Sequence, residues 1–221
     1  MTSSSTDPIE LIAGLGVVPV IAIERASDAV ALADALLEGG LPVAEITFRT
    51  QAAADVLAAI RDARPELCIG AGTVLDEAQL ARAIEAGARF GLAPGFDEKI
   101  VAAAKEASLP FCPGIMTPSD LTVAARSGVR LAKFFPAGAA GGPAFLEAIA
   151  APFAHLGIRF IPTGGVSEMT IGEWLKLKSV IAVGGTWIAR TDDIREGRFS
   201  AITAKARAAV ALARQALETR S

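Results

Sequence analysis

Lys133 is the residue whose setting in this sequence points most strongly to chemistry. It stands inside the apolar segment 131–135 (LAKFF), and a lysine in such surroundings is seldom fully buried unless something pairs with it. Burial penalises the ammonium form and so favours the neutral amine. A neutral amine is the nucleophile that adds to a ketone to form an imine, which makes covalent catalysis one hypothesis for Lys133. The alternative is a buried ion pair that performs no chemistry.

Glu45 has a similar setting in the apolar segment 43–48 (VAEITF). A carboxylate there is either the ion-pair partner of Lys133 or the group that carries protons during addition to a carbonyl. Because side chains alternate along a strand, Glu45 is expected to share a face with Thr47 and Arg49, and Lys133 with Phe135. Two charged residues inside apolar strands favour a nucleophile and general-base pair over two independent structural charges.

Two glycine pairs end later apolar segments. The first is Thr163-Gly164-Gly165, and the second is Gly184-Gly185-Thr186. Without a Cβ atom, backbone N–H groups can approach phosphate oxygens closely, and barrels often bind phosphate in the loops after their last two strands. We therefore predict phosphate binding here, although glycine pairs also occur in ordinary turns.

Short apolar segments rich in β-branched residues must position these groups. Eight of them begin at residues 17, 43, 67, 89, 110, 130, 159 and 180. The distance from one to the next suits a strand, a crossover helix and two short loops. Their nearly continuous hydrophobicity indicates parallel strands that are covered on both faces.

Ala- and Leu-rich stretches with helical spacing lie between these segments. Polar residues that could cap helix N-termini precede several of them: Ser27, Asp76, Asp97, Thr117 and Ser167. Glycines that suit a left-handed C-terminal position follow several others: Gly39, Gly87, Gly128 and Gly157.

The alternation of strands and helices predicts an α/β fold, a (β/α)₈ TIM barrel formed as a single domain by residues 1–221. The stretch before Val17 predicts an additional N-terminal helix, and residues 206–217 (ARAAVALARQAL) predict the last barrel helix. An open doubly wound sheet is the alternative, but the G-x-G-x-x-G pattern expected after its first strand is missing.

Composition and charge exclude several classes of function. Hydrophobic residues make up 52% of the chain and the formal net charge is −3, so we expect a large core and no nucleic-acid partner. No apolar run approaches the length of a membrane span, and the opening residues lack a secretory pattern, so we expect no membrane association and a cytoplasmic location. Cys68 and Cys112 lack metal-ligand spacing and are expected to be reduced, buried thiols. The single histidine, His155, cannot assemble a metal site or a Ser-His-Asp triad, so no metal and no cofactor are predicted.

Five motifs together resemble the 2-keto-3-deoxy-6-phosphogluconate (KDPG) aldolase and 4-hydroxy-2-oxoglutarate aldolase family. They are AEITFRT from Ala44, GAGTVLD from Gly70, KFFPA from Lys133, PTGGV from Pro162 and VGGTW from Val183. The resemblance extends from about Val17 to about Arg190. It implies a class I aldolase, a carbon-carbon lyase of carbohydrate metabolism in the Entner-Doudoroff route. Such an enzyme cleaves KDPG to pyruvate and D-glyceraldehyde 3-phosphate without a metal or cofactor, and it forms a homotrimer.

The same resemblance implies a role for individual residues. Lys133 would form the Schiff base and Glu45 would carry protons. The residues implied to bind the substrate are Arg49, Thr73, Phe135 and Thr163 around the pyruvyl group, and Arg25 at its anionic groups. Those implied to hold phosphate are Gly164, Gly165, Gly184, Gly185 and Thr186.

Two departures from the family pattern concern the phosphate side of the substrate. Thr186 stands where serine is familiar, and Glu24 is acidic where some relatives are basic. The alternatives for the substrate are therefore 4-hydroxy-2-oxoglutarate and the galactonate epimer of KDPG. An alternative of a different class is a barrel that binds phosphate esters without covalent chemistry.

Overall fold

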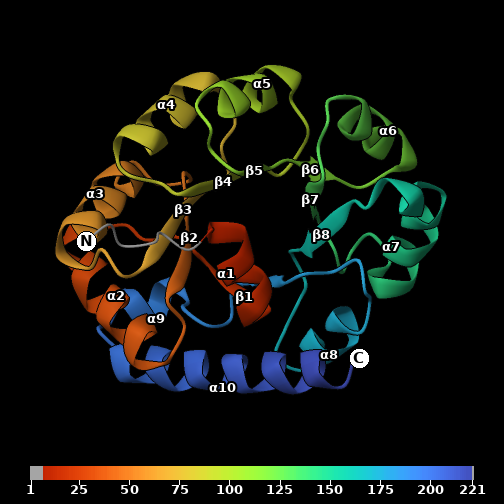
Figure 1. Ribbon diagram of the computed structural model, residues 1–221. Coiled ribbons are helices and arrows are strands. Elements are labelled where there is room, and N and C mark those ends of the chain that lie inside the picture. Colours follow the sequence, from red (N-terminus) through yellow and green to blue (C-terminus); the bar gives the residue numbers. More distant parts are fainter. Residues whose placement is uncertain (1–6, 221) are drawn as a thin grey trace, which may run out of the picture.

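The computed structural model describes residues 7–220, in which parallel strands curl around a common centre and helices cover them on the outside (Figure 1). The strands are β1 (Val17–Ile21), β2 (Val43–Thr47), β3 (Cys68–Gly72), β4 (Phe90–Leu92), β5 (Phe111–Cys112), β6 (Gly114–Ile115), β7 (Leu131–Phe134), β8 (Arg159–Pro162) and β9 (Val183–Gly185). One sheet has the order β5-β4-β3-β2-β1-β9, and the other has the order β6-β7-β8. The predicted α/β fold with parallel strands is confirmed.

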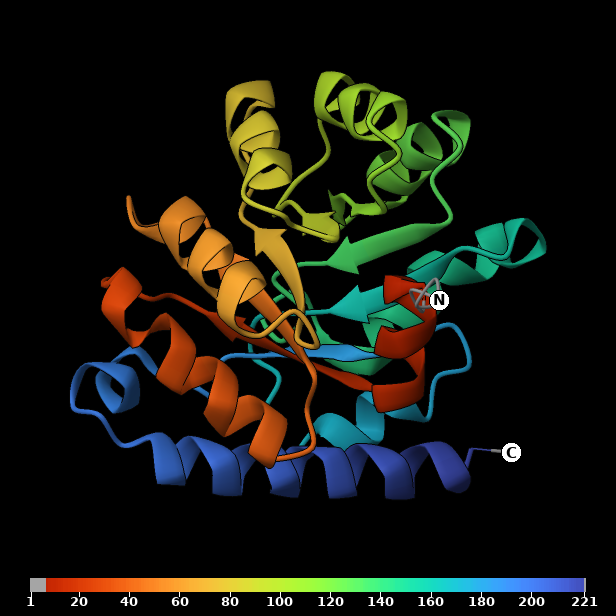
Figure 2. The same cartoon turned by 60° about the vertical axis from the view of Figure 1, so that its left-hand side comes forward.

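The helices follow the strands as the alternating pattern predicts. They are α1 (Pro8–Leu15), η1 (Ala26–Asp28), α2 (Ala29–Glu38), α3 (Ala53–Ala63), α4 (Glu77–Glu85), α5 (Glu98–Glu106), α6 (Pro118–Arg126), α7 (Gly142–Ala150), η2 (Ala151–Leu156), α8 (Ile171–Leu175), α9 (Thr191–Arg195) and α10 (Phe199–Glu218). The additional N-terminal helix is α1, and it lies where β1 begins (Figure 2). The predicted last helix is contained in α10.

The fifth predicted strand is divided by Pro113 into β5 and β6. Proline has no backbone N–H and so interrupts the ladder. As a result β5 pairs with β4 in one sheet, whereas β6 pairs with β7 in the other. The carbonyl of Pro113 accepts a hydrogen bond from the Lys133 backbone N–H at 2.8 Å. This division brings the last strand of one sheet next to the first strand of the other.

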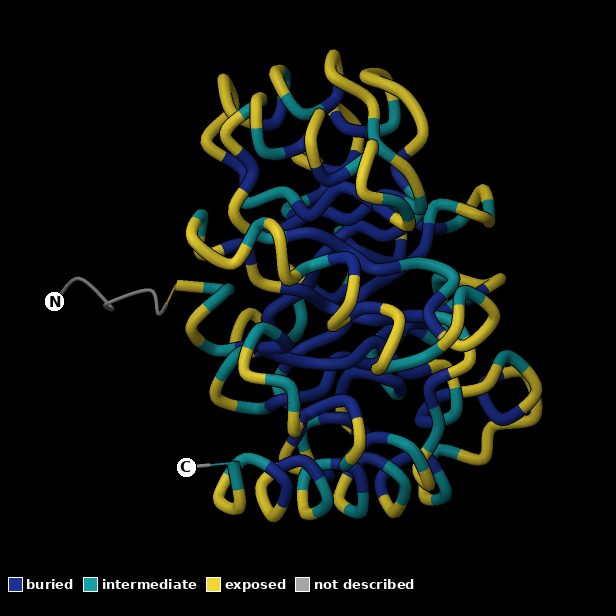
Figure 3. The backbone as a smooth tube through the Cα atoms, turned by 90° about the vertical axis from the view of Figure 1, so that its right-hand side faces the viewer, coloured by how far each residue is buried: buried dark blue, intermediate teal, exposed yellow. Residues whose placement is uncertain are grey.

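The strands form the centre of the hydrophobic core. Every residue of β1, β2 and β3 is buried, and in Figure 3 the buried strands lie inside a layer of helices whose outer turns are exposed. This burial confirms that both faces of the sheet are covered. None of the helices in residues 7–220 is both long and apolar enough to cross a membrane.

Three of the five predicted helix caps are confirmed. The side chains of Asp76, Asp97 and Thr117 accept hydrogen bonds from backbone N–H groups in the first turns of α4, α5 and α6. The predicted caps at Ser27 and Ser167 are wrong. Helix η1 runs directly into α2, with Asp28 at the N-cap position, and α8 begins only after Thr170.

Gly39 corrects another expectation. Its φ is −73°, and the left-handed residue at the end of α2 is Gly40, with φ of 74°. A Cβ atom on Gly39 would lie 2.6 Å from the Cβ atom of Ala206, which is closer than packed side chains approach one another. Gly39 therefore serves the close packing of α2 against α10. Gly87, Gly128 and Gly157 are left-handed as predicted.

Candidate active site

Lys133 and Glu45 meet in the interior of the fold. Lys133 is on β7 and Glu45 is on β2, and the Nζ atom donates a hydrogen bond to Oε1 at 3.2 Å. Relative exposure is 4% for Lys133 and 0% for Glu45. A buried charge is costly unless it is paired, so the pair accounts for the burial of both groups. It also places an amine beside a carboxylate that can exchange a proton with it.

Two polar atoms near this level of the strands lack a hydrogen-bond partner within the described residues. They are Oε2 of Glu45 and Oγ1 of Thr163, and both are buried. Thr163 directly follows β8, and its Oγ1 has room because a Cβ atom on Gly184 would lie only 2.3 Å away. Unsatisfied buried polar atoms are uncommon in native proteins and often mark functional sites.

Thr47, the last residue of β2, hydrogen-bonds both to the neighbouring strand β1 and to Arg49. Its hydroxyl donates to the carbonyl of Ile21 at 2.9 Å and accepts from Nε of Arg49 at 3.2 Å. Thr47 is buried and Arg49 is exposed. The Arg49 guanidinium is therefore held at the carboxyl end of β2, the strand that carries Glu45.

Thr73 has an uncommon backbone conformation at the end of β3. Its φ is 58°, in the left-handed region that β-branched residues rarely occupy. The preceding residue, Gly72, pairs in register with Thr47. Thr73 thus lies beside the end of the strand that carries Glu45, and backbone strain of this kind is concentrated at functional sites.

Phe135 forms one wall beside the amine. Its ring centroid lies 5.7 Å from the Lys133 Nζ atom. Gly164 is close to this ring, since a Cβ atom there would lie 3.0 Å from it. The segment after β7 also docks on the first glycine pair, because the N–H of Gly138 donates to the carbonyl of Gly164 at 2.8 Å. Gly164 and Gly165 both have positive φ, 86° and 82°, which only glycine adopts readily.

A cavity of about 480 Å³ opens at the carboxyl ends of β1, β2 and β9. Arg49 and Thr186 line it, together with Trp187 and Arg190. Among the described residues that line it, none carries a carboxylate, so its charged groups are both cationic. Arg190 was not predicted from the sequence, although its position shortly after the VGGTW motif could have indicated it.

The second glycine pair, Gly184-Gly185, allows close packing at the end of β9. A Cβ atom on Gly185 would lie 2.0 Å from the Trp187 ring. Glycine therefore lets the indole lie against the end of β9, where it lines the cavity.

Arg25 follows β1 and has protein partners of its own. Its Nε donates to Asp28 at 2.8 Å and its Nη2 to the carbonyl of Arg195 at 3.1 Å. It lines a small cavity beside α9 that shares Ala22 and Thr191 with the cavity lined by Arg49. An arginine with these partners is less available to an anion than Arg49.

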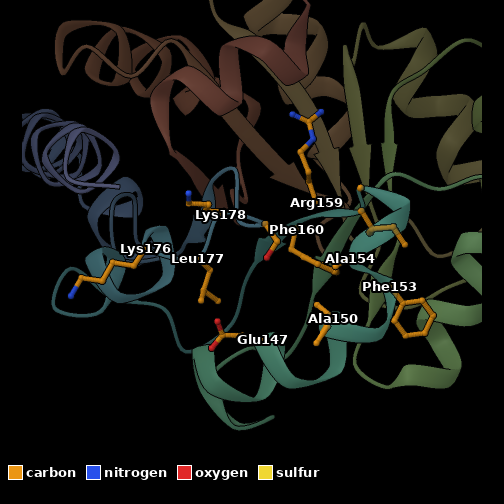
Figure 4. A pocket seen from close by; sticks show the side chains of 13 residues that line it. Glu147, Ala150, Phe153, Ala154, Arg159, Phe160, Lys176, Leu177 and Lys178 are labelled. Carbon is orange, nitrogen blue, oxygen red and sulfur yellow. The ribbon is translucent and has the colours of Figure 1, made fainter. Parts of the chain in front are cut away.

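A cavity larger than the one at the strand ends lies away from the buried pair. It has a volume of about 690 Å³ and is lined by residues of α7, η2, β8 and the segment after α8 (Figure 4). Its lining includes Phe153, Arg159 and Lys178 but none of the predicted site residues. Size alone therefore does not identify the candidate site; the buried amine and carboxylate do.

The remaining reactive side chains have structural settings. Cys68 and Cys112 are free and buried, as predicted. Burial raises the pKa of the Cys112 thiol, while Lys133 acts in the opposite direction and Glu45 in the same direction, so this thiol lies near the pair. His155 is exposed on η2. Within residues 7–220, no group of three or more His, Cys, Asp or Glu side chains is placed to hold a metal ion.

The chain is similar to known aldolases over most of its length. The family model for KDPG and KHG aldolases matches residues 9–205. The chain is 45% identical to the KHG/KDPG aldolase of Escherichia coli K12 over 194 residues, which is 88% of this chain and 90% of that protein. It is 43% identical to the 2-dehydro-3-deoxy-phosphogluconate aldolase of Dickeya dadantii over 211 residues, which is 96% of this chain and 98% of that protein.

A solved structure of a relative shows pyruvate bound covalently. The KDPG aldolase from Legionella pneumophila, with pyruvate captured as a carbinolamine intermediate, matches with a TM-score of 0.87 and 38% identity, covering 92% of this chain and 98% of that one. The Zymomonas mobilis ZM4 enzyme with 3-phosphoglycerate matches with a TM-score of 0.84 and 34% identity, covering 94% and 97%. On the family match and these identities, the chain belongs to the KDPG and KHG aldolase family.

Proposed function

We propose that this protein is a class I aldolase that cleaves 2-keto-3-deoxy-6-phosphogluconate to pyruvate and D-glyceraldehyde 3-phosphate. The observation that carries the proposal is the buried contact between Lys133 Nζ and Glu45 Oε1 at 3.2 Å. The related enzyme that captures pyruvate as a carbinolamine supports covalent chemistry. Glu45 Oε2 and Thr163 Oγ1, which are buried without a hydrogen-bond partner within the described residues, are available to a bound substrate.

The reaction begins at Lys133. Transfer of its proton to Glu45 gives a neutral amine, whose lone pair attacks the C2 ketone of the substrate. Glu45 then returns a proton to the carbinolamine hydroxyl, water leaves, and a protonated imine forms. The carboxylate is well placed for both transfers because it already accepts a hydrogen bond from Nζ.

Cleavage follows from the electron demand of the imine. The C4 hydroxyl loses its proton to Glu45, directly or through water, while the C3–C4 bond breaks. The electron pair of the C3–C4 bond moves into the iminium and produces an enamine. The aldehyde half of the substrate leaves as D-glyceraldehyde 3-phosphate. Protonation of the enamine at C3 and hydrolysis of the imine release pyruvate and regenerate Lys133.

Substrate binding is divided between two ends of the site. Arg49, Thr73, Phe135 and Thr163 surround the pyruvyl end in this proposal. The phosphate end is assigned to the two glycine pairs, Gly164-Gly165 and Gly184-Gly185, and to Thr186. Arg25 remains a candidate for outer anionic contacts only if it exchanges its bond to Asp28. The cationic lining of the 480 Å³ cavity supports an anionic substrate.

The architecture proposed for the active protein is a closed (β/α)₈ barrel in a single domain over residues 1–221. Two features support closure: the bridge between Thr163 and Gly184, and the division of one strand between the two sheets at Pro113. A homotrimer in the cytoplasm is proposed from the family resemblance.

Trapping with pyruvate and borohydride tests the covalent step. Reduction should leave a stable adduct that peptide mapping places on Lys133, and K133M should remain unlabelled and inactive. An unlabelled wild-type protein would remove the proposal.

A second candidate substrate is 4-hydroxy-2-oxoglutarate, because the Escherichia coli relative is named for both activities. The pyruvyl half is the same in both substrates. Comparison of kcat/KM for this compound, KDPG and its galactonate epimer decides between them.

A further inference from the structure

Strand β3 presents no side chain to the interior at two successive inward positions, Gly70 and Gly72. A Cβ atom on Gly70 would lie 2.3 Å from the Phe90 ring. A Cβ atom on Gly72 would lie 2.1 Å from Glu45 Oε1 and 2.6 Å from its Cγ. The neighbouring strands therefore extend one ring and one carboxylate over the bare surface of β3.

The strand register gives the direction in which Glu45 leans. Its Cα pairs with Gly70, and Thr47 pairs with Gly72. The carboxylate therefore reaches along β3 toward its carboxyl end, to the space above Gly72. This is the orientation in which Oε1 accepts the hydrogen bond from Lys133.

The backbone does not explain the glycine at position 72. Gly72 is not among the glycines with positive φ, and it lies inside a parallel strand where glycine is normally unfavourable. A residue with a side chain could adopt this conformation. The contact with Glu45 is the constraint that remains, because an alanine methyl would occupy the position of the carboxylate.

We propose that Gly72 is a positioning residue, whose missing side chain holds open the volume in which the Glu45 carboxylate lies against Lys133. This inference rests on the proposed aldolase function. Glu45 is fully buried, so a methyl group at position 72 displaces the carboxylate from Nζ rather than letting it move into solvent. Displacement by about 1 Å is enough to lower a reaction rate by roughly 10²-fold.

The test is G72A, with G14A as the matched control. Gly14 lies in α1, and a Cβ atom there meets nothing within 4 Å, so G14A should keep the wild-type kcat. We expect G72A to fold, as judged by circular dichroism, and to lose about 10²-fold in kcat. Exchange of the pyruvate methyl protons with solvent should fall in parallel. A folded G72A with wild-type kcat and exchange would overturn the proposal.

A double variant tests the steric claim without relying on activity. If the methyl group collides with Glu45, then shortening that residue must relieve the collision. We expect G72A to lower Tm in the wild-type background, and to lower it much less when it is added to E45A, because that variant has already lost the carboxylate with which the methyl group collides. If G72A alone does not fold, E45A/G72A should fold under the conditions in which E45A folds. Equal losses of Tm from G72A in the wild-type and E45A backgrounds would contradict the steric claim.

Failure of the aldolase function would look different. In that case the wild-type protein would form no borohydride adduct at Lys133 and would not exchange pyruvate protons, while the stability coupling between positions 45 and 72 would remain. An active wild type without that coupling would instead remove only the role of Gly72.

Discussion

Lys133 and Glu45 are 88 positions apart in the chain, yet Nζ donates to Oε1 at 3.2 Å in the interior. The amine comes from the three-stranded sheet and the carboxylate from the six-stranded one. The contact therefore joins the two sheets as well as the two groups assigned to proton transfer and covalent bonding. Removing either charge leaves the other buried without its partner, which is costly.

Replacing Glu45 by glutamine should separate binding from proton transfer. E45Q keeps the size of the side chain but cannot accept a proton, so kcat should fall by about 10²- to 10⁴-fold. Pyruvate should still bind, and borohydride should still label Lys133, although more slowly. Steady-state kinetics and the rate of trapping measure the two effects. Unchanged kcat in E45Q would mean that Glu45 is not the proton carrier.

Replacing Arg190 by alanine should affect phosphorylated substrates selectively. Arg190 lines the cationic cavity with Thr186, and a hydrogen bond to a charged group contributes about 1.5 to 3 kcal/mol, or roughly 10- to 100-fold in affinity. We expect KM for KDPG to rise by about that factor, with little change for 4-hydroxy-2-oxoglutarate. R214A removes the same charge from an exposed position on α10 and should leave both values unchanged. Equal losses on both substrates in R190A would argue against a phosphate contact.

Replacing Thr73 by glycine should increase stability while reducing activity. The φ of 58° is strained for threonine and relaxed for glycine, so T73G should gain on the order of 1 kcal/mol in the free energy of unfolding. Loss of the hydroxyl should raise KM for the keto acid. Urea unfolding and kinetics on the same preparation measure both. A variant that loses stability would mean that the threonine side chain contributes more than the strain costs.

Asp193 should stabilise the fold in a pH-dependent way. Lys205 donates to its carboxylate at 2.5 Å and Arg198 at 2.9 Å, and these hydrogen bonds, led by that of Lys205, lower the pKa of Asp193. A lowered folded-state pKa gives stabilisation that is present above the unfolded value of about 3.9 and is lost as pH falls through the folded value.

D193N should therefore cost on the order of 1 kcal/mol at neutral pH, since both cationic partners are partly exposed. The difference from wild type should shrink at acidic pH. D192N is the control, because Asp192 is an exposed partner of Arg195 and its loss should have a smaller effect. A D193N deficit that persists unchanged in acid would contradict the assigned ionisation.

Neither cysteine should react while the protein is folded. Burial raises the pKa of both thiols, and reactivity requires an accessible thiolate. A chromogenic disulfide reagent at mildly alkaline pH should therefore detect thiols only after denaturant is added. Rapid labelling of the native protein would show that the interior around Cys112 opens.

Local signals in the sequence were sufficient for most of the fold. Apolar runs separated by helical stretches predicted the strands and helices, and Asp76, Asp97 and Thr117 cap helices as expected. The predictions that were wrong concern residues whose role depends on neighbouring elements of the fold. Ser27 has the residue type of a cap, but η1 precedes α2 without a break. Gly39 has the residue type of a helix terminator, but packing against Ala206 is what requires it.

The candidate site shows the same division. Residue type and the apolar pattern were enough to identify Lys133 and Glu45 as candidate site residues, because a charged residue inside an apolar strand can be recognised in the sequence itself. Four features could not be predicted from the sequence. They are the contact between these two residues, the bare surface of β3 at Gly72, the pairing of Arg25 with Asp28, and the presence of Arg190 in the 480 Å³ cavity. Each depends on which strands are neighbours and in what register, and that information is distributed over residues far apart in the chain.

The sequence by itself determined the alternating elements, the faces of the strands and the residues able to do chemistry. Only the tertiary structure decided which of those residues meet. The physical reason is that hydrophobic periodicity encodes the direction of a side chain relative to its own strand. The distance between two side chains on different strands is instead set by how the whole sheet curls and packs.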